Sequence, residues 1–134
     1  MKSIFPVCLL AAVLLSSCGN DDKKEPVTDT DVATAFVRAS LDNDLKTAEK
    51  FILPDDTNRQ YFETFKRQYQ QKDKTELDKY KAADVVIDEL KPENDSVHTV
   101  IYSNTYTNKK SRLKLVWRNN KWLVDLKYTF TETP

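Results

Sequence analysis

The sequence holds few of the residues from which most recognisable binding and catalytic sites are built. It contains one glycine, one histidine and two cysteines. Phosphate-binding loops, dinucleotide-binding fingerprints and nucleophile elbows each need several positions without a Cβ atom, so a single glycine excludes them. Zinc fingers and Cys/His clusters need more cysteine and histidine than the chain has. We therefore expect no cofactor and no metal site.

An excess of charge of one sign is also lacking. Twenty-one basic side chains balance twenty-one acidic ones, so the formal net charge is zero. A protein without a positive field does not concentrate phosphates around itself, and we do not expect nucleic acid among its partners. None of these observations identifies a reaction.

The first seventeen residues have the pattern of a secretory signal peptide. Lys2 precedes an apolar run over residues 4–15, which is shorter than the roughly 20 residues of a membrane-spanning helix. Residues 15–18, Leu-Ser-Ser-Cys, resemble the bacterial lipobox, where a signal peptidase cleaves before a lipidated cysteine. The resemblance implies a lipoprotein in which residues 1–17 are removed and Cys18 carries acyl chains such as palmitate that anchor it to a membrane. An ordinary cleaved signal peptide that contains a cysteine is the alternative.

Residues 18–29 are predicted to form a flexible tether, because this polar segment has almost no apolar side chain to offset the entropy of ordering. Gly19 follows the cysteine, at a position where aspartate would resemble a signal for retention in the inner membrane. We therefore expect an outer-membrane lipoprotein of a Gram-negative bacterium. Asp21 and Asp22 resemble the acidic export tags of some surface lipoproteins, so periplasmic and surface-exposed locations both stay open. The remaining domain, residues 30–134, contains neither glycine nor cysteine.

Helical spacing of apolar residues predicts three helices in the first half of this domain. Asn43 and Asp44 end the first helix and cap the second, and Pro54 stops the second. Residues 72–81 carry too much charge for the core and are predicted to form a loop or a fraying helical turn. The three helices are expected over residues 28 to about 41, 45 to about 52, and 55 to about 71.

Beyond Ala82 the apolar residues alternate with a period of two, which predicts four strands. Asn119-Asn120 favours a two-residue type I′ turn between the last two, because asparagine tolerates positive φ better than any residue except glycine. The strands are expected from residue 85 to a turn at residues 92–95, and over residues 96–107, 110–118 and 121–130.

The asparagine turn fixes the register of the last hairpin. It places Trp117 opposite Trp122 and Lys114 opposite Asp125, so one face of the hairpin is apolar and is predicted to lie under the helices. Asp125 falls on the solvated face and is predicted to form a surface ion pair with Lys114, which contributes little. The apolar face comprises Leu113, Leu115, Trp117, Trp122, Val124, Leu126 and Tyr128.

The facing of the second strand depends on the loop that follows it. A two-residue loop at Asn108-Lys109 pairs Val100 with Trp117, and a four-residue loop preserves the same facing, whereas three- or five-residue loops reverse it. We prefer the first facing because it buries the aromatic side chains. It turns His98, Val100, Tyr102, Asn104 and Tyr106 toward the helices.

The order of elements resembles the nuclear transport factor 2-like superfamily, and in particular small bacterial lipoproteins of unknown function with one such domain. The likeness is carried by Asn43-Asp44-Leu45 and by Leu-Val-Trp-Arg-Asn-Asn-Lys-Trp-Leu-Val-Asp over residues 115–125. It covers about residues 30–130 and implies an α+β fold, a cystatin-like cone in which a strongly bent antiparallel sheet of about four strands wraps the N-terminal helices around a cavity. The superfamily includes isomerases, dehydratases and binding modules, so the fold does not decide the function.

Five residues are candidates for the lining of such a cavity: His98, Tyr102, Asn104, Tyr106 and Tyr128. Their side chains present polar groups on apolar bodies, and core tyrosines with locally bonded hydroxyls are the alternative. His98 has the chemistry of a general base, but no inward-facing carboxylate is predicted to orient it. We therefore assign no catalytic residue.

These observations favour a non-catalytic, lipid-anchored module that binds a small amphipathic ligand or a partner protein in the cone. One alternative is an enzyme that transfers a proton, with His98 and Tyr102 as the acid/base pair. A second alternative is an assembly subunit that forms a homodimer through the outer face of the sheet, where Ile101 is predicted opposite Val116.

Overall fold

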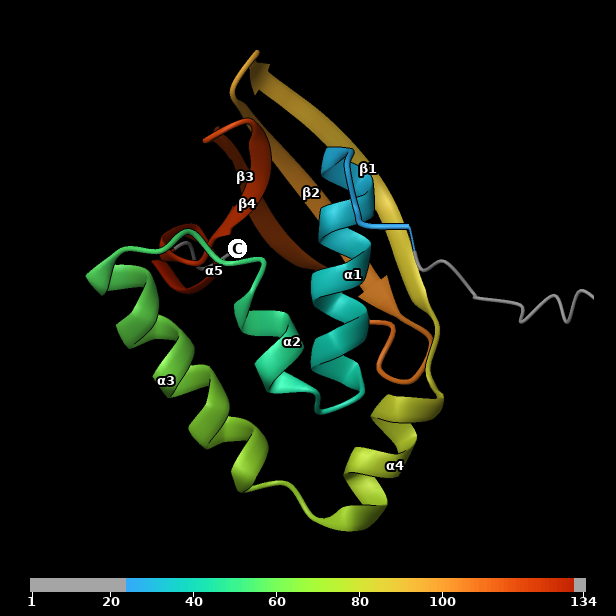
Figure 1. The fold of residues 1–134 in the computed structure, drawn as a ribbon. Coiled ribbons are helices and arrows are strands. Elements are labelled where there is room, and N and C mark those ends of the chain that lie inside the picture. The colour runs from blue at the N-terminus through green and yellow to red at the C-terminus, as the bar shows by residue number, and fades with distance from the viewer. Residues whose placement is uncertain (1–23, 132–134) are drawn as a thin grey trace, which may run out of the picture.

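The computed structural model describes residues 24–131 and has an α+β architecture, with helices packed on one four-stranded antiparallel sheet. The strands follow one another in the order β1-β2-β3-β4. Helix α1 lies across the sheet, and α2 and α3 form a further layer (Figure 1). The predicted signal peptide, Cys18 and the first part of the tether lie outside the described residues. The helices are α1 (Asp29–Leu41), α2 (Leu45–Glu49), α3 (Asp56–Gln70), α4 (Lys74–Ala82) and α5 (Lys127–Thr131), and the strands are β1 (Val85–Asn94), β2 (Val97–Asn104), β3 (Ser111–Arg118) and β4 (Lys121–Asp125).

The first predicted helix is confirmed. The Thr28 hydroxyl accepts from the Asp31 N–H at 3.1 Å, and the Asp31 carboxylate accepts from the Thr28 N–H at 3.2 Å, so α1 begins with a capping box. Asn43 ends the helical run with a φ of 56°, and the Asp44 carboxylate caps α2. The predicted third helix agrees with α3 to within one residue at each end.

Helix α2 is shorter than predicted, because residues 51–53 pair with the edge of the sheet instead. Val124 donates its N–H to the Phe51 carbonyl at 2.8 Å, and Leu53 donates to the Val124 carbonyl at 2.9 Å. Ile52 thereby forms a parallel bridge with Val124. This short segment satisfies backbone groups of β4 that a free edge would leave open.

The predicted loop or fraying turn at residues 72–81 is wrong, since most of it is the regular helix α4. The Asp73 carboxylate caps this helix, and ion pairs at i,i+4 spacing join Lys72 to Glu76 at 2.8 Å and Lys74 to Asp78 at 2.7 Å. Such pairs support a helix that has no buried face. No residue of α4 is buried, so the expectation that this segment lies outside the core is confirmed.

The first hairpin turns later than predicted. Strand β1 continues through Pro92 to Asn94, and the turn consists of Asp95 and Ser96. Proline has no backbone N–H to donate. Strand β1 lies at the edge of the sheet and has a neighbour on one side only, so a proline is tolerated there. The second strand is shorter than predicted and ends at Asn104, whose side-chain oxygen accepts from the N–H groups of Tyr106 and Thr107 and so begins a turn.

The last hairpin has the predicted register. Asn119 and Asn120 have φ values of 51° and 61°, as a type I′ turn requires, and Trp117 lies opposite Trp122.

The predicted facing of β2 is also confirmed, but its register is shifted because six residues, 105–110, join it to β3. Val100 therefore pairs with Leu113 and not with Trp117.

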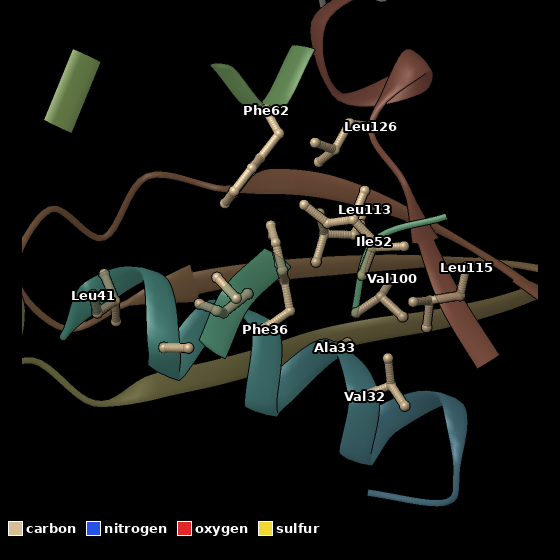
Figure 2. Close-up of a cluster of buried hydrophobic side chains, with 14 residues drawn as sticks. Val32, Ala33, Phe36, Leu41, Ile52, Phe62, Val100, Leu113, Leu115 and Leu126 are labelled. Atoms are coloured by element: carbon tan, nitrogen blue, oxygen red, sulfur yellow. The ribbon is translucent and has the colours of Figure 1, made fainter. Parts of the chain in front are cut away.

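The core lies between α1 and the concave face of the sheet. Figure 2 shows Phe36 of α1 and Phe62 of α3 among side chains of the strands. Val116 and Leu123 are also buried, but they lie outside this cluster, on the opposite face of the hairpin. The fully buried members of the cluster are Val32, Ala33, Phe36, Val37, Ala39, Leu41, Ala48, Ile52, Phe62, Val100, Leu113, Leu115, Val124 and Leu126.

The end of β4 differs most from the prediction. The strand stops at Asp125, and residues 127–131 form helix α5 instead of continuing to Phe130. Tyr128 therefore does not lie on the inner face: its side chain is 40% exposed, with the Lys114 Nζ 3.3 Å from the ring centroid. Trp117, also predicted to be covered by helices, is 37% exposed.

The predicted surface ion pair between Asp125 and Lys114 is wrong. Asp125 lies opposite Lys114 in the register but is 6% exposed, and its Oδ1 accepts from the Asn58 side-chain amide at 3.2 Å. Asn58 is fully buried; its amide also donates to Asp55 at 3.0 Å, and its oxygen accepts from the Leu126 N–H at 2.6 Å. Lys127 completes the group, with its Nζ 3.2 Å from the Asp55 carboxylate. We call these four side chains, Asp55, Asn58, Asp125 and Lys127, the Asn58 network.

We predict that Asn58→Ala lowers the free energy of unfolding by roughly 2–5 kcal/mol, because it leaves the buried Leu126 N–H without its acceptor and removes the amide donor of the buried Asp125 carboxylate. Chemical denaturation measures the change. Gln60→Ala, on an exposed position of the same helix, is the control and should change the free energy by less than about 0.5 kcal/mol. A loss below about 1 kcal/mol for Asn58→Ala would show that the network is not a constraint on the fold.

The pKa of Asp55 is lowered, chiefly by the hydrogen bond from the Asn58 backbone N–H. A carboxyl whose pKa is depressed by folding adds stability above its unfolded pKa of about 3.9, and this stability is lost as the pH falls through the folded value. We predict that Asp55→Asn, which keeps a capping side chain, destabilises the protein at pH 7 and that the deficit shrinks at pH 3. Denaturation at both pH values measures this, with Asp56→Asn as the exposed neighbouring control. A deficit equal at both pH values would contradict the prediction.

Candidate functional site

A cavity of about 210 Å³ lies between α1, α3 and the inner face of the sheet. Its walls combine apolar side chains of the core with tyrosines and small hydroxyl residues. Thr107 and Lys109 are exposed and mark its mouth, beside the loop between β2 and β3. The lining consists of Phe36, Val37, Ser40, Leu41, Phe65, Tyr69, Tyr80, Tyr102, Asn104, Thr107, Lys109, Ser111, Leu113, Leu126 and Thr129.

The aromatic wall of the cavity follows from the spacing of residues on α3. Phe65 and Tyr69 are four residues apart and therefore share one face of the helix, with ring centroids 4.8 Å apart. Phe65 also contacts Phe36 of α1 at 6.3 Å between centroids. Because bulky rings hold the two helices at this separation, α3 does not close down on the inner face of β2 and β3.

The buried phenols of the wall are neutral hydrogen-bonding groups. Burial raises the pKa of Tyr69, and it raises the pKa of Tyr102, which a hydrogen bond with Ser111 partly opposes. Both hydroxyls therefore keep their protons at physiological pH. The Ser40 hydroxyl donates to the Phe36 carbonyl at 2.8 Å.

One polar atom in the lining has no hydrogen-bond partner among the residues that the structure describes. This atom is the buried Thr129 Oγ1. A buried hydroxyl without a partner costs roughly 1–3 kcal/mol, whereas a water or a ligand in the cavity would relieve this cost. The cavity thus combines an apolar wall with an unsatisfied hydrogen-bonding group.

Beside the mouth of the cavity, three tyrosine rings contact one another in a row, and lysine ammonium groups lie over these rings. Tyr80 of α4 lies 6.3 Å from Tyr69 and 5.1 Å from Tyr106, measured between ring centroids. The Nζ of Lys72 lies 4.9 Å from the Tyr80 ring, and that of Lys79 lies 5.6 Å from the Tyr106 ring. Helix α4, which was not predicted, therefore builds one side of this entrance.

The structure brings two of the five candidate residues together at the cavity. Tyr102 and Asn104 line it, on the inward-facing positions of β2. Tyr106 lies in the turn after β2, is 39% exposed and packs on Tyr80 outside the lining. Tyr128 lies on the exposed side of α5, and His98 lies at the far end of β2.

His98 has the carboxylate partner that the sequence did not predict. Its Nδ1 lies 2.5 Å from the Asp29 carboxylate, and both side chains are about 15% exposed. The ring also packs on Trp122 at 4.4 Å. Asp29 was assigned to the tether, 69 residues away in sequence, so only the fold reveals the pair. Because His98 is not part of the cavity lining that includes Tyr102, the two do not form the predicted acid/base pair at one cavity.

Several lining residues carried no signal that identified them in the sequence. Ser40 and Ser111 are single small polar residues, and Lys109 lies in a loop whose length was predicted incorrectly. Thr129 was expected on a strand. Tyr102, Asn104, Leu113 and Leu126, by contrast, were predicted to face inward, and Phe65 and Tyr69 have the four-residue spacing of one helix face.

Within residues 24–131 no three histidine, cysteine, aspartate or glutamate side chains are grouped as metal ligands. None of the helices in the same range has the length and apolarity needed to cross a membrane. Comparison with protein-family models, curated proteins and solved structures finds no match to this chain.

Proposed function

We propose that this chain is a lipid-anchored module of the cell envelope that binds a small amphipathic molecule in the cavity between α1, α3 and the sheet. The observation that carries the proposal is the combination of an apolar wall, buried neutral phenols and the unpartnered Thr129 hydroxyl around one space of about 210 Å³. Ligand pockets characteristically pair an apolar lining with a few polar groups that orient the ligand. The module acts by binding and not by catalysis.

The fold supports a nuclear transport factor 2-like cone. Its α+β order, the helix laid across a bent antiparallel sheet and the cavity at one end are what that resemblance implies (Figure 1). The location proposed for the module is the outer membrane of a Gram-negative bacterium, on its periplasmic side or its surface.

The two other functions have less support. The enzyme would need His98 and Tyr102 to reach one point, whereas the cavity is lined by Tyr102 alone of the two. The homodimer would need an exposed apolar patch, but Ile101 lies opposite Arg112, and Val116 is 4% exposed within a single chain. A partner protein would have to insert a side chain into a space of about 210 Å³, which suits a small molecule better.

We predict that p-cresol, a neutral amphipathic probe, binds the purified chain with a Kd between about 10 μM and 1 mM. An engineered apolar cavity of about 150 Å³ holds benzene, so 210 Å³ at the same filling holds about eight non-hydrogen atoms, the size of p-cresol. A ligand of that size gains of order 0.5–0.9 kcal/mol per atom. Isothermal titration calorimetry measures the affinity.

The matched variants for this measurement are Ser111→Phe, which fills the cavity, and Ser111→Ala, which leaves it open. We expect Ser111→Phe to abolish binding and Ser111→Ala to retain it, with circular dichroism checking the fold. Thr129→Phe fills the space from α5 if the first variant does not fold. No binding to the wild-type chain, or equal binding to the filled variants, would contradict the proposed function.

We predict that Cys18→Ser abolishes incorporation of radiolabelled palmitate in a Gram-negative host and leaves the signal peptide uncleaved, because the thiol accepts the lipid and cleavage requires the lipidated residue. Cys8→Ser, which alters the other cysteine, is the control and should leave both labelling and cleavage unchanged. If the Cys18→Ser variant still incorporated palmitate, the proposed lipid anchor at Cys18 would be contradicted. The proposal that the cavity binds a ligand would not be affected.

A further inference from the structure

We propose that the natural ligand of the cavity is a small single-ring carboxylate whose carboxylate group binds Lys109 at the mouth. This inference rests on the proposed function and adds the charge and the orientation of the ligand. It is carried by the charge of the cavity lining, by the state of Lys109 and by the positions of the uncharged polar groups.

The lining has a charge of one sign only. Of the fifteen residues that line the cavity, Lys109 alone is charged, and the set contains no aspartate or glutamate. An amine in this space would meet a cation and no counter-ion, whereas an acid would meet its counter-ion at the entrance. The lining thus selects against cationic ligands as well as for anionic ones.

Lys109 also has no ion pair among the described residues. Lys79, whose Nζ lies over the Tyr106 ring, is likewise without one within residues 24–131, but it does not line the cavity. Lys72 is paired with Glu76 and Lys74 with Asp78, and Lys127 with Asp55. These cations are already neutralised by partners on the protein. In the part of the chain that the structure describes, Lys109 is the one unpaired cation that also lines the cavity, and its exposed position keeps part of a bound carboxylate in water, which limits the desolvation cost.

The uncharged polar groups of the lining provide hydrogen-bonding partners for a second polar group of the ligand. Thr129 Oγ1 is buried and unpartnered, and the Tyr69 and Tyr102 phenols keep their protons because burial raises the pKa of each. None of these groups carries a charge. A ligand with its acid at Lys109 and a hydroxyl or carbonyl oxygen elsewhere on its ring can use both kinds of group, with the ring against the apolar lining that includes Phe36 and Phe65.

The size of the cavity sets the size of the ring system. About eight non-hydrogen atoms fit inside, which is one six-membered ring, one substituent oxygen and the carbon of a carboxylate. The two carboxylate oxygens then lie at the mouth. 4-Hydroxybenzoate has this composition, and it is p-cresol with the methyl group replaced by a carboxylate, so the two compounds form a matched pair of probes.

The test is calorimetry of both probes with the wild-type chain and with Lys109→Gln, using Lys110→Gln as the control for loss of a neighbouring exposed charge. We expect the wild-type chain to bind 4-hydroxybenzoate roughly three- to tenfold more tightly than p-cresol, the gain of one partly exposed charge-assisted hydrogen bond. Lys109→Gln should abolish this preference without weakening p-cresol binding, and Lys110→Gln should keep it. Raising the salt concentration should reduce the preference in the wild-type chain.

The outcomes separate the two proposals. If p-cresol binds and 4-hydroxybenzoate binds no more tightly, the anion inference is overturned while the proposed function stands. The same conclusion follows if Lys109→Gln and Lys110→Gln reduce the preference equally, because the effect is then a general property of the surface charge. If neither probe binds, both proposals are overturned.

Discussion

The hydrogen bonds of one buried amide, Asn58, determine how the C-terminal part of the chain leaves the sheet. The side chain accepts from the Leu126 N–H and donates to carboxylates of Asp55 and Asp125, so it joins the start of α3 to the last residue of β4. These contacts hold the chain at the point where β4 ends. The chain therefore turns at Leu126 and forms α5, which carries Thr129 to the wall of the cavity.

The cavity exists because the layer above the sheet is built from large rings that meet one another. Phe36, Phe65 and Tyr69 keep α1 and α3 apart, and α4 adds Tyr80 at the edge. In a small domain such a space normally costs stability, since apolar walls lose contacts across it. A protein that keeps both the space and an unpartnered hydroxyl in it gains those interactions when a ligand enters, and this gain supports the proposed binding function.

Local chemistry predicted several parts of the fold that depend on neighbouring residues, although the local cap and ion pairs of α4 were missed. The Thr28 capping box, the Asn43-Asp44 junction and the Asn119-Asn120 turn each follow from a few adjacent side chains. The prediction was wrong wherever a distant partner decides the outcome. Asp125 and Lys114 were paired correctly in register, but the burial of Asp125 depends on Asn58, 67 residues away.

The candidate site was predictable only in part for the same reason. Tyr102 and Asn104 line the cavity because the parity of β2 was right, whereas Tyr106 and Tyr128 were placed on strands that end before them. Lys109 was visible in the sequence only as a loop residue, and the carboxylate that orients His98 comes from the first turn of α1. The charge and spacing of residues along the chain do not predict which side chains the six-residue loop between β2 and β3 places at the mouth of the cavity.

The most direct test of the account is to locate a bound ligand by nuclear Overhauser effects between the ring protons of 4-hydroxybenzoate and ¹³C-labelled leucine and valine methyl groups of the purified chain. The account predicts contacts to the methyls of Leu113, Leu126 and Val37, which line the cavity and are buried in the free protein. Contacts confined to exposed methyls such as those of Val86 and Leu90 would contradict it, because the ligand would then lie on the surface of the edge strand.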